Sequence, residues 1–297
     1  MKKTCIIISG PTAVGKTALA ISVANQFSTG IISADSRQCY KELAIGVAKP
    51  SLDELAAVPH YFINSHSIHE SVNAAVFEKY ALDKVQEIFL TNDVAVVVGG
   101  TGLYINVFCS GMDEVPIISP GIREKIIHEY EKGGLLWLQM EVKKNDPIYF
   151  SKGEILNPHR LIRALEVVLS TGKSILEFQT QINQTRDFNI IKIGLELPRE
   201  ELYQRINSRV DKMVQQGLVD EVSGLIAHQE LNALKTVGYR ELFDYFSGKI
   251  SLLEAIEAIK INTRHYSKRQ MTWFKKDTTI SWAPPDFSQV LPLISLR

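Results

Sequence analysis

The sequence is poor in cysteine and has no long hydrophobic run, and both shortages narrow what the protein can be. Its 297 residues include three cysteines, Cys5, Cys39 and Cys109, which lie far apart and form no Cys-x-x-Cys pair. That spacing predicts neither a zinc site nor a disulfide framework, and it favours a reduced, cytoplasmic setting. The apolar run near Met1 is too short for a signal peptide, and the composition does not indicate a membrane span.

Net charge is also absent. The 33 lysines and arginines balance the 33 aspartates and glutamates, so no overall field attracts nucleic acid. Basic residues are nonetheless concentrated between Lys260 and Lys276, where no acidic residue occurs and aromatic and amide side chains are interleaved. This mixture suits phosphate contacts and base stacking, but it equally suits a solvated basic helix face.

The strongest signal that is present is a glycine loop near the N-terminus, Gly10-Pro11-Thr12-Ala13-Val14-Gly15-Lys16-Thr17. It lies between an apolar run and a helical pattern, which is the context of a phosphate-binding P-loop. In such a loop, backbone N–H groups and Lys16 hold phosphate oxygens, and the Thr17 hydroxyl holds Mg²⁺. The loop predicts a diphosphate or nucleotide ligand, with ATP binding as one expected property. The alternative is a glycine turn that only links strand to helix.

Three segments expected to be strands, residues 5–9, 30–34 and 93–98, end in polar or glycine-rich turns. Parallel strands present their carboxyl ends at one edge of a sheet, so these turns should share one cleft. A short strand over 59–64 and a crossover helix over 71–90 are also expected. The pattern predicts an α/β fold: a P-loop NTPase-like, mostly parallel sheet flanked by helices.

A change of character near Met112 predicts a second domain. Residues 114–189 carry mainly helical patterns, clearest over 156–170, and strand character returns at 190–195. We therefore expect a helical insertion domain at 114–189, within a catalytic core made of 1–113 and 190–297. Two helices over 252–275 and a strand over 278–282 should complete the core.

Arg205 and Arg209 are four positions apart in an expected helix and therefore share one face. They suit a phosphate clamp of the kind found in small-molecule kinases, or a surface salt-bridge face with Glu201 or Asp211. The strand over 93–98 ends in glycines, not in the acidic residue that helps ATPases hold magnesium. The residues alone leave open a P-loop kinase of a nucleotide or small molecule, and a non-catalytic RNA-binding module.

Six runs, taken in order, are more specific than the P-loop alone. They are Gly10-Pro-Thr-Ala-Val-Gly-Lys-Thr17, Ser33-Ala-Asp-Ser-Arg-Gln38, Ala48-Lys-Pro50, Gly99-Gly-Thr-Gly-Leu-Tyr104, Arg163-Ala-Leu-Glu-Val167 and Thr263-Arg-His-Tyr-Ser-Lys-Arg-Gln-Met-Thr-Trp273. Together they resemble the tRNA dimethylallyltransferases, also called tRNA isopentenyltransferases. The zinc-finger extension of eukaryotic members is missing, so the resemblance is to the bacterial form. It implies a prenyltransferase that moves a dimethylallyl group from dimethylallyl diphosphate to N6 of adenosine 37, beside the tRNA anticodon.

The resemblance also implies roles for single residues. Asp35 is the expected general base and Thr101 a ligand of the target base, while Lys16, Arg209 and Arg205 would stabilise the departing diphosphate. Without the resemblance, Asp35 would be interpreted as a helix cap and Thr101 as a turn residue. The expected contacts with the anticodon stem-loop are Asp35, Ser36, Arg37, Gln38, Thr101, Arg123, His159, Arg160, Leu161, Ile162, Arg163, Arg264, Lys268, Arg269 and Trp273. A monomer is expected, because one chain supplies both donor and acceptor surfaces.

Overall fold

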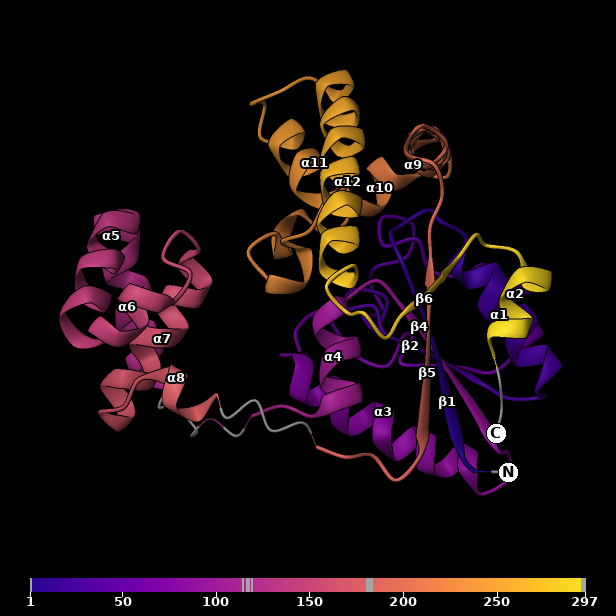
Figure 1. Ribbon diagram of the computed structural model, residues 1–297. Helices are drawn as coiled ribbons and strands as arrows, with labels where there is room; N and C mark the ends of the chain where they lie inside the picture. Colours follow the sequence, from indigo (N-terminus) through magenta and orange to yellow (C-terminus); the bar gives the residue numbers. More distant parts are fainter. Residues whose placement is uncertain (1, 114, 116–117, 119, 180–183, 295–297) are drawn as a thin grey trace. The chain divides into compact units, whose positions relative to one another are not determined.

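The computed structural model describes residues 2–113, 115, 118, 120–179 and 184–294. Its strands form a six-stranded sheet in the order β3-β2-β4-β1-β5-β6, with β1 between β4 and β5 (Figure 1). Every pairing of neighbouring strands is parallel, which confirms the α/β architecture. The strands are β1 (Thr4–Ser9), β2 (Ile31–Ser33), β3 (His60–Tyr61), β4 (Val94–Gly99), β5 (Asn189–Leu195) and β6 (Ser281–Ala283).

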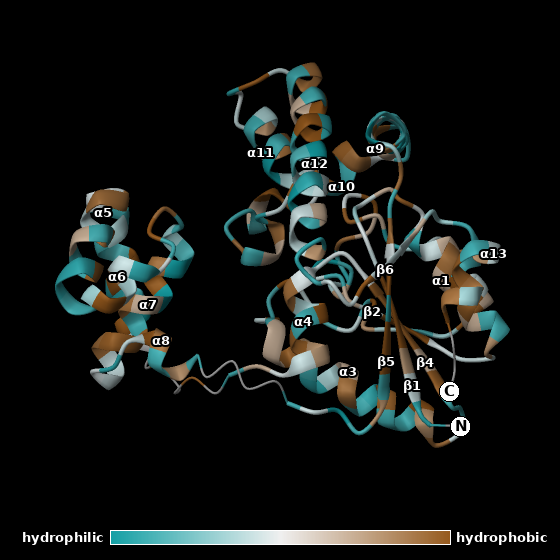
Figure 2. Ribbon diagram, in the orientation of Figure 1, coloured by the Kyte–Doolittle hydropathy of each residue, from teal (hydrophilic) through white to brown (hydrophobic). Residues whose placement is uncertain are grey.

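Both faces of the sheet are covered because its central strands are apolar on both sides (Figure 2). Along β1, Ile6 and Ile8 pack into one core and Cys5 and Ile7 into the other. Figure 1 shows α1 on one face and α3 with α4 on the opposite face. The α-helices of this part are α1 (Lys16–Gln26), α2 (Leu52–Ala57), α3 (Ala74–Phe89) and α4 (Gly102–Ser110).

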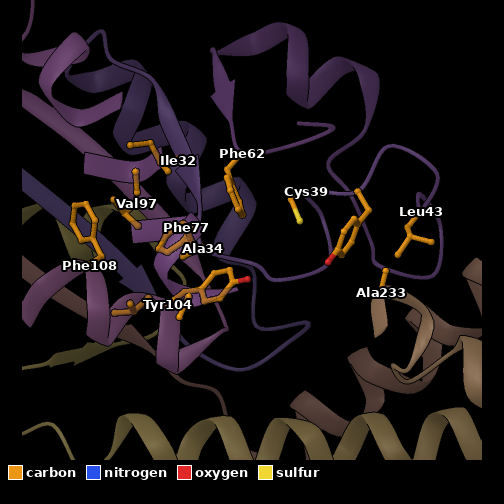
Figure 3. Close-up of a cluster of buried hydrophobic side chains, with 14 of the residues drawn as sticks. Ile32, Ala34, Cys39, Leu43, Phe62, Phe77, Val97, Tyr104, Phe108 and Ala233 are labelled. Carbon is orange, nitrogen blue, oxygen red and sulfur yellow. The ribbon is translucent and has the colours of Figure 1, made fainter. Parts of the chain in front are cut away.

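The core beneath α3 and α4 is rich in aromatic rings. Figure 3 shows Ile32 and Val97 of the sheet in this cluster, together with Phe77 of α3 and Tyr104 of α4. The rings of Phe77 and Tyr104 are stacked, with centroids 4.5 Å apart. This packing holds α4, and the glycine turn that precedes it, against the carboxyl end of the sheet.

After β5 the chain forms a group of helices. They are α9 (Arg199–Gln215), α10 (Leu218–Ser223), η1 (Ile226–His228), η2 (Asn232–Leu234), α11 (Tyr239–Phe246), α12 (Leu252–Phe274), α13 (Phe287–Val290) and η3 (Leu291–Leu293). The stretch expected to hold two helices, 252–275, forms the single helix α12. A capping box between Ser251 and Glu254 starts this helix, and no glycine or proline interrupts it.

Two of the expected strands have other bounds in the structure. The strand expected over 59–64 is only His60–Tyr61, because Phe62 and Asn64 have positive φ angles of 60° and 52°. The strand expected over 278–282 is Ser281–Ala283.

The chain divides into two compact units, Met1–Ser110 with Thr185–Arg297, and Gly111–Gln184. The sequence had placed the ends of the insertion at 114 and 189. The second unit contains α5 (Pro120–Asn145, interrupted at Gly134), α6 (Pro147–Lys152), α7 (Pro158–Thr171) and α8 (Ile175–Phe178). Its own core includes Leu138, Val142 and Leu165. Among the residues just described, no helix is long and apolar enough to cross a membrane.

Candidate active site

The glycine loop joins β1 to α1 and leaves an anion-binding surface open. Gly10 and Gly15 have φ angles of 146° and 106°, and Ala13 has a φ of 64°. A Cβ on Gly10 would lie 2.8 Å from the carbonyl oxygen of Leu195, so no side chain fits there. No side chain caps the first turn of α1, whose unpaired N–H groups therefore remain available to a ligand.

Lys16 bonds to its own loop in this structure. Its Nζ donates to the carbonyl oxygens of Gly10 at 3.0 Å and Pro11 at 2.7 Å. Burial, assisted by the nearby Arg209 guanidinium, lowers the pKa of Lys16 to about 7, although Asp35 acts in the opposite direction. Near neutral pH, the Lys16 amine is therefore present in both its charged and its neutral form.

A first cavity of about 360 Å³ opens from this loop. Lys16 and Thr17 line it, together with Asp35, Arg205 and Arg209. Its volume is that of a small-ligand site, and Lys16, Lys49, Arg205 and Arg209 bring positive charge to its lining. The cavity therefore suits a compact anion with a short tail.

The two arginines of α9 differ in their partners. Arg209 donates from Nη1 to the Thr12 hydroxyl at 3.2 Å, and burial lowers its pKa. Arg205 forms a salt bridge with Glu201 at 2.8 Å, which is the alternative to a phosphate clamp that the sequence left open. Both line the first cavity, but only Arg209 is bonded to the P-loop.

Thr17 is the residue expected to hold Mg²⁺, and it lines the same cavity. Across the residues that the structure describes, no group of three or more His, Cys, Asp or Glu side chains could hold a metal ion. Mg²⁺ commonly keeps several waters and shares phosphate oxygens with its ligand. The Thr17 hydroxyl, beside the P-loop, therefore suits Mg²⁺ that is held mainly by waters and phosphate oxygens.

Asp35 follows β2 and has two distinct carboxylate oxygens. Oδ1 accepts from the backbone N–H of Arg37 at 2.9 Å and of Gln38 at 3.4 Å, so the capping role exists. None of the described residues donates a hydrogen bond to Oδ2. Asp35 lines both the first cavity and a second one, so the carboxylate stands where the two meet.

Thr101 bridges the turns that follow β4 and β2. Its N–H donates to the Ala34 carbonyl at 3.2 Å, and its Oγ1 accepts from the Ser36 N–H at 3.1 Å. Its hydroxyl also lowers the pKa of Tyr266, which burial and Asp35 raise to about 12 overall. Thr101 lines neither cavity, whereas its neighbours Ser36 and Tyr266 do.

Three of the six runs meet in space. The Gln270 amide donates to the Gly100 carbonyl at 2.9 Å, and its oxygen accepts from the Thr12 N–H at 2.9 Å. A Cβ on Gly102 would lie 2.2 Å from the Trp273 ring. The glycines of the turn after β4 therefore make room for α12, and Gln270 ties that turn to the P-loop.

The second cavity has a volume of about 350 Å³ and shares Thr12, Asp35, Arg209 and Tyr266 with the first. Among the described residues, Asp35 is the one acidic side chain in its lining. The basic residues of its lining are Arg37, Arg209, Lys235, Arg240 and Arg269. Sequence reasoning missed Lys235 and Arg240, because two cations on either side of a glycine are a weak signal.

The basic stretch of α12 is partly neutralised. Lys260 pairs with Asp211 and Glu257, and Arg264 donates to Asn207 at 2.6 Å. In contrast, the described residues offer no carboxylate partner to Lys268 or Arg269, which are exposed. Trp273 packs over the glycine turn and keeps 42% of its surface exposed. Within the described part of the chain, the exposed, unpaired cations of α12 are therefore Lys268 and Arg269, fewer than the basic stretch of the sequence suggested.

Gln38 is engaged inside the protein. Its oxygen accepts from the Ser33 hydroxyl at 3.0 Å, and its amide donates to the carbonyls of Ala48 at 2.9 Å and Val47 at 3.4 Å. The amide thus holds the loop 47–48 beside both cavities. Its expected contact with the target nucleotide stays a prediction, and it requires an exchange of these bonds.

In the second unit, a buried carboxylate organises two of the expected RNA ligands. Glu166, 1% exposed, pairs with Arg123 at 2.7 Å and with Arg163 at 3.3 Å. His159 and Arg160 are exposed at the start of α7. Leu161 and Ile162 are buried in the core of the unit, so their side chains hold α7 in place. Their expected contact with tRNA stays a prediction, and through their side chains it is not available in this arrangement.

Comparison with known proteins identifies the family to which this chain belongs. Residues 38–277 match the family model described as IPP transferase. The chain belongs to the IPP transferase family. The resemblance inferred from the six runs is confirmed, and family members are prenyl-transferring enzymes.

The similar proteins span nearly the whole chain. A tRNA dimethylallyltransferase of Christiangramia forsetii is 49% identical over 95% of this chain and 93% of its own. A tRNA dimethylallyltransferase 1 of Bacteroides thetaiotaomicron is 44% identical over 95% of this chain and 92% of its own.

Solved structures agree with these relatives and confirm the P-loop-like fold class. The tRNA isopentenylpyrophosphate transferase of Bacillus halodurans is similar with a TM-score of 0.71 and 34% identity, covering 97% of this chain and 92% of that one. A eukaryotic dimethylallyltransferase described as acting on tRNA has a TM-score of 0.78 and 27% identity, covering 97% of this chain and 75% of that one.

Proposed function

We propose that this IPP transferase moves a dimethylallyl group from dimethylallyl diphosphate to N6 of adenosine 37 in tRNA. The observation that carries the proposal is the position of Asp35 between two cavities, one opening on an anion cradle and the other lined by cations. A donor with an anionic end suits the first cavity. A nucleotide of a polyanionic acceptor suits the second.

In the first cavity the diphosphate is the leaving group. Its oxygens replace the loop carbonyls as partners of Lys16, and the uncapped N–H groups of α1 hold the rest. Arg209, already bonded to the P-loop, adds a second cation. When bound through Thr17, Mg²⁺ supplies further positive charge to the diphosphate. These groups stabilise the negative charge that develops as the C–O bond breaks.

In the second cavity the adenine amine needs a base, since its lone pair is delocalised into the ring. The free Oδ2 of Asp35 takes the proton from N6 while the N–C bond forms and the bond from carbon to the diphosphate breaks. Oδ1, held by the Arg37 N–H, fixes the carboxylate. The two interpretations of Asp35, cap and base, therefore use different oxygens.

We further propose that the anticodon stem-loop is the part of tRNA that is bound. A loop adenosine leaves its stack at low cost, and single-stranded loops are the usual targets of base-specific RNA enzymes. Phosphate contacts come from Lys268 and Arg269 in one unit, and from Arg123, Arg160 and Arg163 in the other. We propose that the protein is a monomer, because one chain carries both cavities. We also propose a cytoplasmic location, in keeping with its three scattered cysteines.

One assay tests the proposal. The protein is incubated with unmodified tRNA, Mg²⁺ and dimethylallyl diphosphate labelled in its allyl group, and label is sought in the RNA. The matched control is the same tRNA with guanosine at position 37, which lacks the N6 amine and should stay unlabelled. Transfer of the γ-phosphate of ATP to a small molecule, with no label in tRNA, would establish the kinase alternative instead. RNA binding without turnover of either donor would leave the non-catalytic module.

A further inference from the structure

We propose that Glu221 of α10 is a positioning residue of the transfer reaction, which holds the wall loop, residues 44–48, beside both cavities. The inference deepens the proposed function and rests on it. Val47 and Ala48 of this loop line both cavities, and Gly46 lines the second. Glu221 itself lines neither, so its effect on the substrates passes through the loop.

The Glu221 carboxylate accepts two hydrogen bonds at each of its oxygens. Oε2 accepts from the backbone N–H groups of Ala44 at 3.2 Å and Ile45 at 2.7 Å. Oε1 accepts from the N–H of Gly46 at 3.1 Å and from the Tyr239 hydroxyl at 2.6 Å. Successive N–H groups that converge in this way suit an anion, and bonds to a carboxylate are stronger than bonds to a neutral acceptor. An amide could not replace the carboxylate, since its NH₂ group would face donors.

The wall loop needs such an anchor because its backbone is not in a relaxed form. Ala48 has a φ of 51°, a left-handed value that residues other than glycine seldom adopt. The Ala48 N–H donates to the Ile45 carbonyl at 2.9 Å and closes the turn. Ile45 is therefore held at both of its polar backbone groups, the N–H by Glu221 and the carbonyl by Ala48. Conformations of this kind persist where the surrounding structure fixes them.

A second anchor connects the wall loop to the segment that follows β2. The Gln38 amide donates to the carbonyls of Val47 at 3.4 Å and Ala48 at 2.9 Å. The Gln38 N–H in turn donates to Oδ1 of Asp35 at 3.4 Å. The wall loop is thus bonded both to Glu221 and to the segment that carries the proposed base. A shift of this loop would change the space available to both substrates.

Tyr239 supplies the fourth hydrogen bond to Glu221. Its ring is buried and occupies the space beside Gly46, where a Cβ would lie 2.6 Å from it. Burial raises the pKa of the Tyr239 hydroxyl, and the Glu221 carboxylate raises it further. The hydroxyl therefore stays protonated near neutral pH and remains a donor.

The same carboxylate connects the wall loop to the helix of Arg209. α10 begins directly after Gly217, whose φ of 99° turns the chain from the end of α9. Arg209 of α9 lines both cavities. Glu221 therefore joins the loop that forms one part of their lining to the helices that supply another.

The test compares Glu221→Gln with the unaltered protein in donor binding and in kinetics. Calorimetry with dimethylallyl diphosphate and Mg²⁺ should give a Kd about tenfold higher in the variant, the equivalent of one lost charge-assisted hydrogen bond. The KM for tRNA should rise as well, because the wall loop also lines the second cavity. kcat should stay nearly unchanged, since the wall serves bound substrates and transition state alike.

Asp220→Asn is the matched control, because Asp220 is an exposed carboxylate of the same helix and lines neither cavity. This variant should bind donor and tRNA as the unaltered protein does. Tyr239→Phe keeps the ring beside Gly46 and removes one of the four bonds to Glu221. Its donor affinity should therefore fall less, by about threefold.

A purely structural role would lower the Tm of Glu221→Gln but leave the donor Kd and the KM for tRNA of the folded enzyme unchanged, and that result overturns the inference. If Glu221→Gln does not fold, Tyr239→Phe decides, and a donor affinity equal to that of the unaltered protein overturns the inference too. If the unaltered protein neither binds the donor nor transfers its allyl group to tRNA, the proposed function fails first, and the two failures are thereby distinguished.

Discussion

Gly99 and Ala34 approach so closely that a methyl group on Gly99 would lie 2.2 Å from the carbonyl oxygen of Ala34. Gly99 ends β4, and Ala34 follows β2 and directly precedes Asp35. The obstructing atom belongs to the backbone and cannot rotate away. The backbone position of Asp35, the proposed general base, therefore depends on the absence of a side chain at Gly99 of the neighbouring strand.

Gly99→Ala should displace this backbone and so affect both stability and turnover. Overpacking of this kind costs about 1–3 kcal/mol, which lowers Tm by roughly 2–4 °C per kcal/mol in a domain of this size. Gly224→Ala is the control, because its nearest atom would be the Glu221 carbonyl oxygen at 3.6 Å. That variant should stay within about 0.5 kcal/mol of the unaltered protein. Equal melting curves for the two variants would contradict the argument.

Asp35→Asn separates the two roles of this side chain. The amide oxygen can still accept from Arg37 and Gln38, so the cap is kept, but an amide cannot take the proton from N6. Single-turnover rates should fall by about two to four orders of magnitude, with tRNA affinity nearly intact. Asp35→Ala should fall as far and in addition lose the cap, visible as a lower Tm. Full activity in Asp35→Asn would reduce Asp35 to a helix cap.

The pKa of Lys16, about 7 in the free protein, gives donor binding a pH dependence of definite sign. Above this pH the amine is mostly neutral, whereas the bound diphosphate favours the ammonium form, so binding takes up a proton. Donor affinity should therefore weaken as pH rises above about 7, by at most tenfold per pH unit. Calorimetry at about pH 8 in two buffers of different ionisation enthalpy measures the proton directly. Lys16→Met should show no uptake, and the same result in the unaltered protein would refute the mechanism.

The double variant Lys268→Ala/Arg269→Ala tests the exposed part of α12. Loss of two phosphate contacts should weaken tRNA binding and reduce the salt slope by about two units. Lys276→Ala is a suitable control, because Lys276 is exposed just beyond α12 and lines neither cavity. A slope unchanged by the double variant would mean that this surface is merely solvated.

The parts of this fold that follow from local pattern were predictable. The strand, loop and helix around Lys16, and the apolar strand before Gly99, were expected where they occur because periodicity and glycine spacing are local properties. The end of β3 was not, since it depends on the positive φ of Phe62, whose ring contacts Phe77 and Tyr80 of a helix farther along the chain, and such tertiary contacts leave no local pattern.

The site was predictable as far as motifs reach. Asp35 and Arg209 were expected near the P-loop and line the cavity there. The bridge from Gln270 to Gly100 joins residues 170 positions apart, and no sequence period reports such a contact. The burial of Leu161 and Ile162 was likewise hidden, because a motif does not distinguish the residues that support a surface from those that form it.

The wall that the two cavities share has a practical consequence. A single synthetic molecule with a diphosphate mimic at one end and an adenine-like ring at the other would occupy both cavities. The linker between its two ends would pass Asp35 and Tyr266, which line both cavities. Its second end would bind at the high effective concentration created by the first, so affinity could exceed that of either fragment by orders of magnitude. Selectivity over other P-loop proteins would come from the adenine-like end, since an inhibitor confined to the anion cradle addresses a feature that many nucleotide-binding enzymes have.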